Sequence, residues 1–321
     1  MATAQKPNTF DLSQLDRVWT MPATVNWIVP DLIAEGSTNV ISSDPGLGKS
    51  YLSLDIAGKV AHGQDSAWGP IQPRQVVYID RENPLAVVKR RLLDLGIART
   101  PNLIIWGPWE IREPAGPDDI AIIKYARMHK PVFIWDSFVA FNPGDEQSAD
   151  ETRDFMQQFK NLATEGATNW ILHHAGKANT AKEYRGSSDI KAAVDMAFKL
   201  SAPGARPNQP IDRLVIEPFK TRIVPVTGRT LKLVPGSGFV LDTGVDPLTV
   251  LRRIVETQPG LNQSKIVELA QKSGVGRNKV EVILKNSAVF RSEPGAKNNE
   301  KLWYVIADGS TPGQGCGLSA A

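Results

Sequence analysis

The sequence predicts an α/β fold, in which a mostly parallel β-sheet carries helices on both faces, followed by a small helix-turn-helix module. Apolar runs of strand type alternate with stretches of helical spacing from Val40 to Leu172, and this alternation is typical of parallel sheets with crossover helices. A glycine-rich turn joins the first strand to the first helix, and three further helical segments follow beyond Pro247.

The length and composition favour two compact domains of a cytoplasmic protein. The chain has 321 residues, of which 41% are hydrophobic, enough for about two domains with packed cores. It shows neither an apolar run long enough to span a membrane nor a secretion leader. Its single cysteine excludes an internal disulfide, as expected in a reducing compartment.

Five short apolar runs of the first domain are predicted strands, and their alternation with helices indicates a mostly parallel sheet. These strands are Val40–Ser42, Val76–Ile79, Leu103–Trp106, Val132–Trp135 and Trp170–Leu172. The predicted helices between them cover 49–61, 85–95, 118–129 and 150–166, where apolar residues recur at helical spacing.

The pattern changes after Leu200, where three short strands separated by proline and glycine predict β-hairpins at the edge of the sheet. They are Arg213–Glu217, Thr230–Val234 and Phe239–Leu241. We therefore expect a flexible arm over 1–24, the α/β domain over 25–245, a second domain over 247–307 and a flexible tail over 308–321.

The second domain has the outline of a winged helix-turn-helix, with three helices and two strands. The predicted helices cover 248–257, 262–272 and 276–286, and the predicted strands are Val289–Ser292 and Leu302–Ile306. Gly274 forms the predicted turn, and helical spacing assigns the core to Ile266, Leu269, Ala270, Val280, Ile283 and Leu284.

The second domain is also basic. Residues 247–307 hold ten lysines and arginines against five acidic residues, a net charge of +5 in a chain whose total is +3. A basic module on a nearly neutral body indicates nucleic acid as a partner. A solvated basic surface is the alternative, because such patches are common.

The strongest motif is SDPGLGKS at 43–50, between a strand and a helix. Glycines let backbone N–H groups turn toward a phosphate, and the helix N-terminus adds a partial positive charge. In such a loop Lys49 reaches the β- and γ-phosphates and Ser50 ligates Mg²⁺. We expect the nucleotide to contact Ser43, Asp44, Pro45, Gly46, Leu47, Gly48, Lys49, Ser50 and Tyr51. Ser43 stands where such loops usually carry glycine or alanine, and its Cβ is strained if φ is positive there.

Two carboxylates follow apolar strands at positions that suit nucleotide hydrolysis. Asp136 ends the fourth strand and is expected to support the metal ion. The next residue is Ser137 rather than a glutamate, so the water-activating base is expected on a neighbouring strand, where Glu82 follows the second strand. The structural alternative for Glu82 is a helix cap before Pro84.

With these residues in place, the chain resembles the RecA-like ATPases close to RepA-type hexameric replicative helicases. The matching pieces are SDPGLGKS at 43–50, YIDREN at 78–83, FIWDS at 133–137, LHHAGK at 172–177 and YRGSSDIKAAVD at 184–195. Their order and spacing match over 25–245. The resemblance implies a RecA-like P-loop NTPase core that hydrolyses ATP with Mg²⁺. It also implies a homo-oligomer, in the form of a hexameric ring, that acts on DNA as a helicase or translocase in replication of a plasmid or phage-like element.

The resemblance also assigns a role to one of two adjacent histidines. His174 matches the family's sensor of the γ-phosphate, and it is favoured over His173 because alternate strand residues face opposite sides. One departure concerns Asp145 and Glu146, which make a channel loop acidic and unsuited to direct DNA contact.

Cationic residues in two places match the family's DNA loop and its trans-acting finger. Lys177, Lys182 and Arg185 lie in the loop that faces DNA in RecA-like rings, and solvated loop charges are the plain alternative. Lys220 and Arg222 follow the third-last strand of the first domain and match the cations that complete a neighbouring subunit's site.

The resemblance does not cover the second domain, whose role rests on its own pattern. Its helix over 276–286 is expected to expose Arg277, Asn278 and Lys279. Such a helix enters a major groove, where arginine reads guanine and asparagine reads adenine, so duplex DNA joins single-stranded DNA as an expected partner. Two other functions stay open: an ATP-switched winged-helix regulator, and a helicase-loader or assembly ATPase whose winged helix binds a protein.

Overall fold

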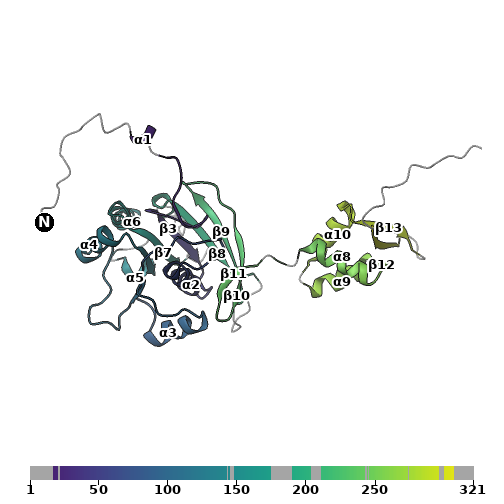
Figure 1. Ribbon diagram of the computed structural model, residues 1–321, viewed down its shortest axis with the longest axis horizontal. Coiled ribbons are helices and arrows are strands. Elements are labelled where there is room, and N and C mark those ends of the chain that lie inside the picture. The colour runs from purple at the N-terminus through teal and green to yellow at the C-terminus, as the bar shows by residue number, and fades with distance from the viewer. Residues whose placement is uncertain are drawn as a thin grey trace, which may run out of the picture. The chain divides into compact units, whose positions relative to one another are not determined.

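A computed structural model of the protein describes residues 17–20, 22–142, 144, 148–174, 190–203, 211–242, 244, 246–273, 275–295 and 300–306. The chain forms two compact units, residues 1–242 and 243–321 (Figure 1). Each unit has a hydrophobic core of its own.

A nine-stranded sheet runs through the first unit in the order β11-β10-β9-β8-β3-β7-β6-β4-β5. Neighbouring strands are parallel from β8 to β5: β8 (Met196–Ser201), β3 (Thr38–Ser43), β7 (Thr168–His174), β6 (Val132–Asp136), β4 (Val76–Asp80) and β5 (Leu103–Trp106). The antiparallel strands β9 (Arg213–Thr221), β10 (Arg229–Val234) and β11 (Gly238–Leu241) extend one edge as hairpins. The mainly parallel α/β sheet and its edge hairpins, both predicted from the sequence, are therefore confirmed.

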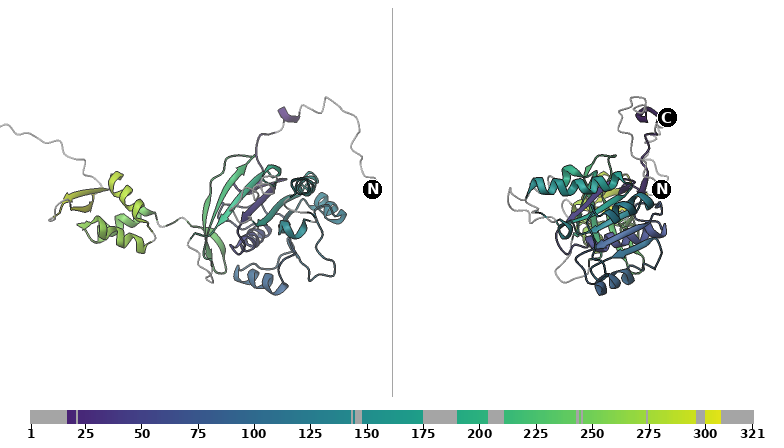
Figure 2. Two further views of the ribbon diagram at one scale, coloured as in Figure 1. Left: turned by 180° about the vertical axis from the view of Figure 1, so that it is seen from behind. Right: turned by 90° about the vertical axis from the view of Figure 1, so that its left-hand side faces the viewer.

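Helices cover both faces of this sheet (Figures 1 and 2). One face packs against α2 (Lys49–His62) and α3 (Leu85–Asp94), and the other against α4 (Ile120–His129), α5 (Phe138–Phe141) and α6 (Ala149–Thr164). The sequence of α6 shows why it forms: the Ser148 side chain caps it by accepting from the N–H of Glu151, and acidic residues occupy its first turn. Its buried stripe recurs at helical spacing and consists of Thr152, Phe155, Met156, Phe159 and Leu162.

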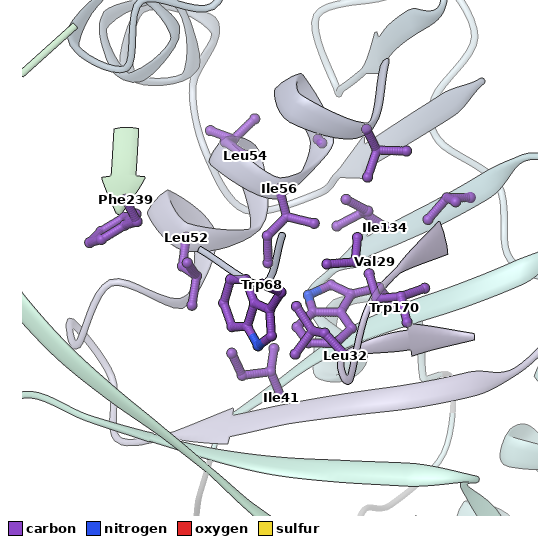
Figure 3. Close-up of a cluster of buried hydrophobic side chains, with 14 of the residues drawn as sticks. Val29, Leu32, Ile41, Leu52, Leu54, Ile56, Trp68, Ile134, Trp170 and Phe239 are labelled. Carbon is purple, nitrogen blue, oxygen red and sulfur yellow. The ribbon is translucent and has the colours of Figure 1, made fainter. Parts of the chain in front are cut away.

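The larger core lies between the sheet and α2. Trp68 and Trp170 lie among Leu32, Ile41 and Ile56 (Figure 3). The indole N–H of Trp170 donates to the Ser53 hydroxyl at 2.9 Å, which satisfies a buried polar group and links β7 to α2. Every residue of β4 and β6 is buried, which explains why these strands appear in the sequence as continuous apolar runs.

A buried ion pair fixes α2 to the edge strand β11. Asp55 and Lys59 form a salt bridge of 2.8 Å with both side chains nearly enclosed. Lys59 also donates to the carbonyl of Phe239 at 2.6 Å, and the N–H of Phe239 donates to Asp55 at 3.1 Å. Gly238 permits this approach because a Cβ there would overlap the Asp55 carboxylate. The helix that follows the phosphate loop is therefore held by charge-assisted bonds as well as by apolar packing.

The structure adds elements that the sequence pattern does not predict. They are α1 (Arg17–Thr20), β1 (Trp27–Val29), β2 (Ile33–Ala34), α5 and β8. It also corrects β9, which continues to Thr221, so that Lys220 lies within the strand rather than after it. The register against β8 shifts next to Pro218, where a bulge removes the need for the N–H that proline lacks.

Within its described residues, the second unit holds three helices and a small antiparallel sheet. The helices are α8 (Pro247–Thr257), α9 (Gln263–Lys272) and α10 (Arg277–Asn286), close to their predicted bounds. The sheet has the order β12-β14-β13, with β12 (Leu261–Asn262), β14 (Lys301–Val305) and β13 (Phe290–Pro294). Among the described helices of either unit, none is both long and apolar enough to cross a membrane.

The core of the second unit follows the predicted pattern with one correction. Ile266, Ala270, Val280 and Leu284 are buried, and Ile283 packs at the margin of the same cluster. Val267 is buried in place of Leu269, which is only half-buried, because the inner stripe of α9 runs through positions 266, 267 and 270. Gly274, the predicted turn residue, lies outside the described residues.

Candidate functional site

The predicted site residues of the first unit converge at the carboxyl ends of neighbouring parallel strands. These strands lie in the order β3-β7-β6-β4. Ser43 of β3 is level with His174 of β7, and Asp136 of β6 is level with Asp80 of β4. The loops and side chains that follow these strands therefore share one edge of the sheet, the place at which open α/β sheets bind ligands.

The loop between β3 and α2 has the backbone that phosphate binding needs. Gly46 and Gly48 have φ values of +78° and +84°, a left-handed region in which a side chain is strained. Gly48 is the N-cap of α2, and among the described residues no side chain caps this end. The N–H groups of the first turn and the helix dipole therefore face the loop, where an anion fits.

Ser43 carries none of the strain that a Cβ causes at positive φ. Among the described residues only Asp31 and Lys130 combine a positive φ with a side chain. Ser43 is buried, and its hydroxyl donates to the carbonyl of Asp44 at 2.9 Å. Serine at this position therefore supplies a hydroxyl beside the loop without distorting the end of β3.

The ammonium group of Lys49 lies among hydrogen-bond acceptors at the loop. Its Nζ donates to the carbonyl of Ser43 at 2.9 Å, to the Ser43 hydroxyl at 3.0 Å and to the carbonyl of Asp44 at 3.2 Å. Burial lowers the pKa of Lys49, and the negative charges of Asp136, Glu82 and Asp44 oppose this shift. The cation is thus held by neutral acceptors, which an anionic ligand would replace with a stronger charge-assisted contact.

His174 lies between Lys49 and Glu82. Its Nδ1 is 3.2 Å from Lys49 Nζ. An ammonium group only donates, so Nδ1 accepts and the neutral ring carries its proton on Nε2, which lies 3.6 Å from Glu82 Oε1. His173 faces the opposite side, buried with its ring 5.7 Å from that of Phe138. His174 therefore contacts the lysine on one side and lies close to the carboxylate on the other.

Glu82 is positioned by residues from two strands. The N–H groups of Glu82 and Asn83 both donate to Oδ1 of Asp80 at 2.8 Å, which folds the chain back after β4. Glu82 Oε1 accepts a hydrogen bond from the hydroxyl of Ser137, directly after β6. Pro84 is the N-cap of α3, so the interpretation of Glu82 as the cap of that helix is wrong.

Asp136 lies at the centre of the carboxyl edge. Its Oδ2 accepts from the hydroxyl of Tyr78 at 2.6 Å, and the nearby hydroxyl of Ser50 acts to lower the pKa of the carboxyl group. Burial raises the pKa of Asp136 to about 6, although the hydrogen bond from Tyr78 opposes the shift. Ser50 and Asp136 together offer the hard oxygen ligands that Mg²⁺ prefers.

The protein alone does not surround a metal ion. Within the described residues no group of three or more His, Cys, Asp and Glu side chains is placed to hold one. A site with one carboxylate and one hydroxyl is typical of Mg²⁺ that arrives with phosphate oxygens and water as its other ligands. The donor set at Ser50 and Asp136 therefore fits Mg²⁺ bound together with a nucleotide.

Sequence reasoning missed four residues of this site: Tyr78, Asp80, Asn83 and Ser137. Tyr78 and Asp80 belong to β4, Asn83 follows this strand, and Ser137 directly follows the neighbouring strand β6. Their position was visible in the sequence, but the pairing of Tyr78 with Asp136 and of Ser137 with Glu82 depends on strand order, which a single sequence does not give.

Lys220 and Arg222 lie together against the segment that precedes β8. Lys220 Nζ and Arg222 Nη2 both donate to the carbonyl of Ala192, at 3.1 Å and 2.5 Å, and Lys220 also donates to the carbonyl of Lys191. Burial and the positive charge of Arg222 lower the pKa of Lys220. The two cations are therefore grouped, as their spacing predicts.

This pair of cations lies at the opposite end of the sheet from the phosphate loop. Thr221 is level with Asn39 of β3 through their shared partner in β8. The loop begins only after Ser43, roughly 13 Å farther along the strand at the usual rise per residue. Arg222 therefore does not reach the phosphate loop of its own chain.

The remaining predicted residues have mixed positions. In the loop, Asp44 and Pro45 are exposed and Leu47 is half-buried. Tyr51 packs edge-on against Phe239 with 6.1 Å between ring centroids. The residues outside the described parts of the chain are Lys177, Lys182, Arg185, Asp145 and Glu146. In the second unit, the exposed residues at the start of α10 are Arg277, Asn278 and Lys279.

Comparisons with known proteins bear on the first unit. The sequence profile described as AAA domain matches residues 4–180, more than half of the chain. The flagellar accessory protein FlaH from Methanocaldococcus jannaschii is 14% identical over 65% of this chain and 90% of that chain, with a TM-score of 0.45. A second solved structure, the ATPase domain of another protein, is 12% identical over 71% of this chain and 96% of that chain, with a TM-score of 0.49.

His173 makes the stability of the first unit depend on pH. Burial lowers the pKa of His173 from 6.5 to about 4, so the unfolded chain binds this proton more readily than the folded chain. The stabilisation is complete above the unfolded pKa and is lost as the pH falls toward the folded value. We expect this residue to lower the free energy of unfolding by about 2 kcal/mol between pH 7.5 and pH 5.

Denaturant titration of wild type and His173→Gln at both pH values measures this contribution. Tryptophan fluorescence reports the first unit, because only Trp303 lies beyond it. The His173→Gln variant should lose about 2 kcal/mol of the pH dependence. The exposed control His129→Gln keeps His173 and should keep the wild-type dependence. The same pH dependence in His173→Gln and wild type would contradict the assignment.

Proposed function

The chain belongs to the AAA domain family, and on this premise we propose that it is an oligomeric, Mg²⁺-dependent ATPase that acts on DNA as a helicase or translocase. One observation carries the proposal. Side chains from α2 and from the ends of three parallel strands meet at one phosphate loop, namely Lys49, Ser50, Asp136, Glu82 and His174. These groups suffice to bind phosphate, hold a metal ion and activate water.

The loop provides a site for the polyphosphate of ATP. Lys49 exchanges its neutral acceptors at Ser43 and Asp44 for phosphate oxygens, while the N–H groups at the start of α2 bind the same chain of phosphates. Ser50 and Asp136 hold Mg²⁺, which when bound neutralises charge on the phosphates. The two side chains already lie close enough for the hydroxyl of Ser50 to act on the pKa of Asp136.

Glu82 is the proposed base that orients the attacking water. Its side chain is 34% exposed, so water has access, while the hydroxyl of Ser137 holds the carboxylate in place. His174 is the proposed sensor because it contacts both Lys49 and Glu82. When Lys49 moves toward phosphate, Nδ1 of His174 loses its hydrogen-bond donor. The imidazole ring of His174 then passes this change on to the side chain of Glu82.

DNA contact is assigned to Lys177, Lys182 and Arg185. The segment that carries them leaves β7 directly after His174 and returns at the helical turn 190–193. That turn is the one on which Lys220 and Arg222 hydrogen-bond. The proposed DNA segment thus begins at the phosphate sensor and ends at the finger cations, which supports a coupling of DNA binding to hydrolysis. Flexible lysines and arginines are suited to a phosphodiester track.

The proposed finger requires an oligomer. Lys220 and Arg222 lie at the amino end of β3, away from the phosphate loop of their own chain, so they serve the site of a neighbouring subunit. A planar guanidinium there neutralises charge that develops on the transferred phosphoryl group. The hexameric ring comes from the resemblance to RepA-type helicases, and any closed ring satisfies the geometric requirement.

The second unit is proposed to be a winged-helix domain over 247–307 that contacts duplex DNA. Its three helices and the sheet β12-β14-β13 match that outline, and Arg277, Asn278 and Lys279 are exposed at the start of α10. The same observation favours one second candidate, a regulator that binds a duplex site and uses ATP only to control assembly. Dependence of hydrolysis on single-stranded DNA separates the two functions.

We expect ATP hydrolysis that single-stranded DNA stimulates and that Lys49→Ala lowers by about 100-fold or more, because this variant loses a preorganised cation at the phosphates. Steady-state phosphate release with and without single-stranded and duplex DNA measures both effects. Lys124→Ala, an exposed lysine of α4, is the matched control and should leave hydrolysis unchanged. Absence of hydrolysis under every condition would refute the motor and leave the regulator.

Arg222→Ala should lower hydrolysis by about 10³–10⁵-fold if the guanidinium acts in trans as proposed. Mixing provides the sharper measurement. Lys49→Ala subunits retain the finger and Arg222→Ala subunits retain the phosphate loop, so mixed assemblies should regain hydrolysis that neither variant has alone. The control is Arg99→Ala, an exposed arginine of the first unit. Wild-type hydrolysis by Arg222→Ala, or no recovery in the mixture, would rule out the trans role.

A further inference from the structure

The outer face of α10 combines one apolar side chain with polar and cationic ones. Asn278, Val282 and Lys285 follow one another at i, i+4 and i+7, so they lie along one stripe of the helix. Val280 and Leu284 on the opposite side are buried in the core of the second unit. The stripe therefore points directly away from the core.

Val282 is the unusual member of this stripe. It is 56% exposed, more than any other large apolar side chain among the described residues of the second unit. A single exposed valine needs no partner in itself. Here, however, the valine lies among polar and cationic side chains. Asn278 and Lys285 are one helical turn away on either side. Arg277 and Lys279 are next to Asn278 in the first turn.

Each helix of the second unit carries lysine or arginine residues. On α9, Lys265 and Lys272 pair with Glu268, and on α8, Arg252 pairs with Glu256. These cations are paired within their own helices, and α8 and α9 each keep a net charge of +1.

On α10 itself, Lys285 takes part in no ion pair among the described residues. The charge of Lys279 helps to lower the pKa of Asp246, and Arg277 approaches Glu281 at the limiting distance of 4.0 Å. With three cations against the single carboxylate of Glu281, α10 carries a net charge of +2 around Val282. Charge of this kind complements the phosphates of a nucleic acid, so the occupant to which the face points is duplex DNA.

We propose that α10 reads A·T base pairs in the major groove, with Val282 packed on the C5-methyl group of thymine and Asn278 bonded to adenine. Thymine alone offers a methyl group in that groove, and asparagine pairs with N6 and N7 of adenine. The helix rises about 6 Å from Asn278 to Val282, which spans roughly two base-pair steps. The inference rests on the proposed DNA function and adds sequence specificity to it.

The test uses the full-length protein and a random pool of duplex DNA. Repeated selection should enrich a site in which an adenine and a thymine lie within two or three base pairs of each other. Uracil in place of that thymine removes only the methyl group. Wild-type protein should then bind about fourfold more weakly, as expected for one methyl group returned to water.

Two variants assign the effect to the helix. Val282→Ser should bind the thymine and uracil duplexes equally, and Asn278→Ala should lose the preference at the adenine. Val87→Ser, an exposed valine on α3 of the first unit, is the matched control and should keep the fourfold difference.

Three results would overturn the inference: selection that enriches no site, no weakening by uracil in wild type, or methyl dependence that persists in Val282→Ser. If single-stranded DNA still stimulates hydrolysis in any of these cases, the DNA-dependent ATPase stands without this specificity. Binding of neither duplex nor single-stranded DNA would remove the proposed function as well.

Discussion

A buried ammonium group sets the arrangement of the phosphate site. Lys49 is only 5% exposed, and a charge so enclosed is tolerated only where acceptors and opposite charges surround it. The acceptors come from the end of β3 and from His174 on β7, and the negative charges come from Asp136 and Glu82 after β6 and β4. The surroundings of Lys49 therefore include residues at the carboxyl ends of four neighbouring strands. The groups that phosphoryl transfer requires are the same ones that keep Lys49 charged inside the protein.

The fold gives this point a rigid support and places the phosphate loop and the Lys220–Arg222 pair at opposite ends of the sheet. Ser53 and the Asp55–Lys59 pair fix α2 to β7 and β11, so the residues at the start of α2 are held by rigid elements, as a reactive site requires. The phosphate loop lies at the carboxyl end of β3, and Lys220 and Arg222 lie at its amino end. A subunit built in this way suits a head-to-tail assembly, in which each contact joins opposite ends of two sheets.

The sequence predicts the buried parallel strands well and the contacts between them poorly. β4 and β6 are recognisable because all their residues are apolar except the aspartate that ends each strand. The phosphate loop is recognisable by the spacing of its glycines, lysine and serine. β8 was missed although it lies at the centre of the sheet, because its residues MAFKLS carry a lysine and no clear turn precedes them. β9 was predicted to end before Pro218, because proline usually ends a strand. In the structure, a β-bulge opposite β8 accommodates Pro218 and the strand continues. Tyr78 and Ser137 could not be assigned, since their partners depend on which strands are neighbours.

The most direct test of this account is single-turnover ATP hydrolysis by Glu82→Gln, measured beside its affinity for ATP. Glutamine keeps the shape of Glu82 but cannot accept a proton, and the phosphate loop is unchanged. The account predicts ATP affinity within a few-fold of wild type and a hydrolysis rate lower by about 10²–10⁴-fold. The exposed control Glu110→Gln should hydrolyse normally. Hydrolysis at the wild-type rate by Glu82→Gln would contradict the central claim, because the water would then be activated by a different group.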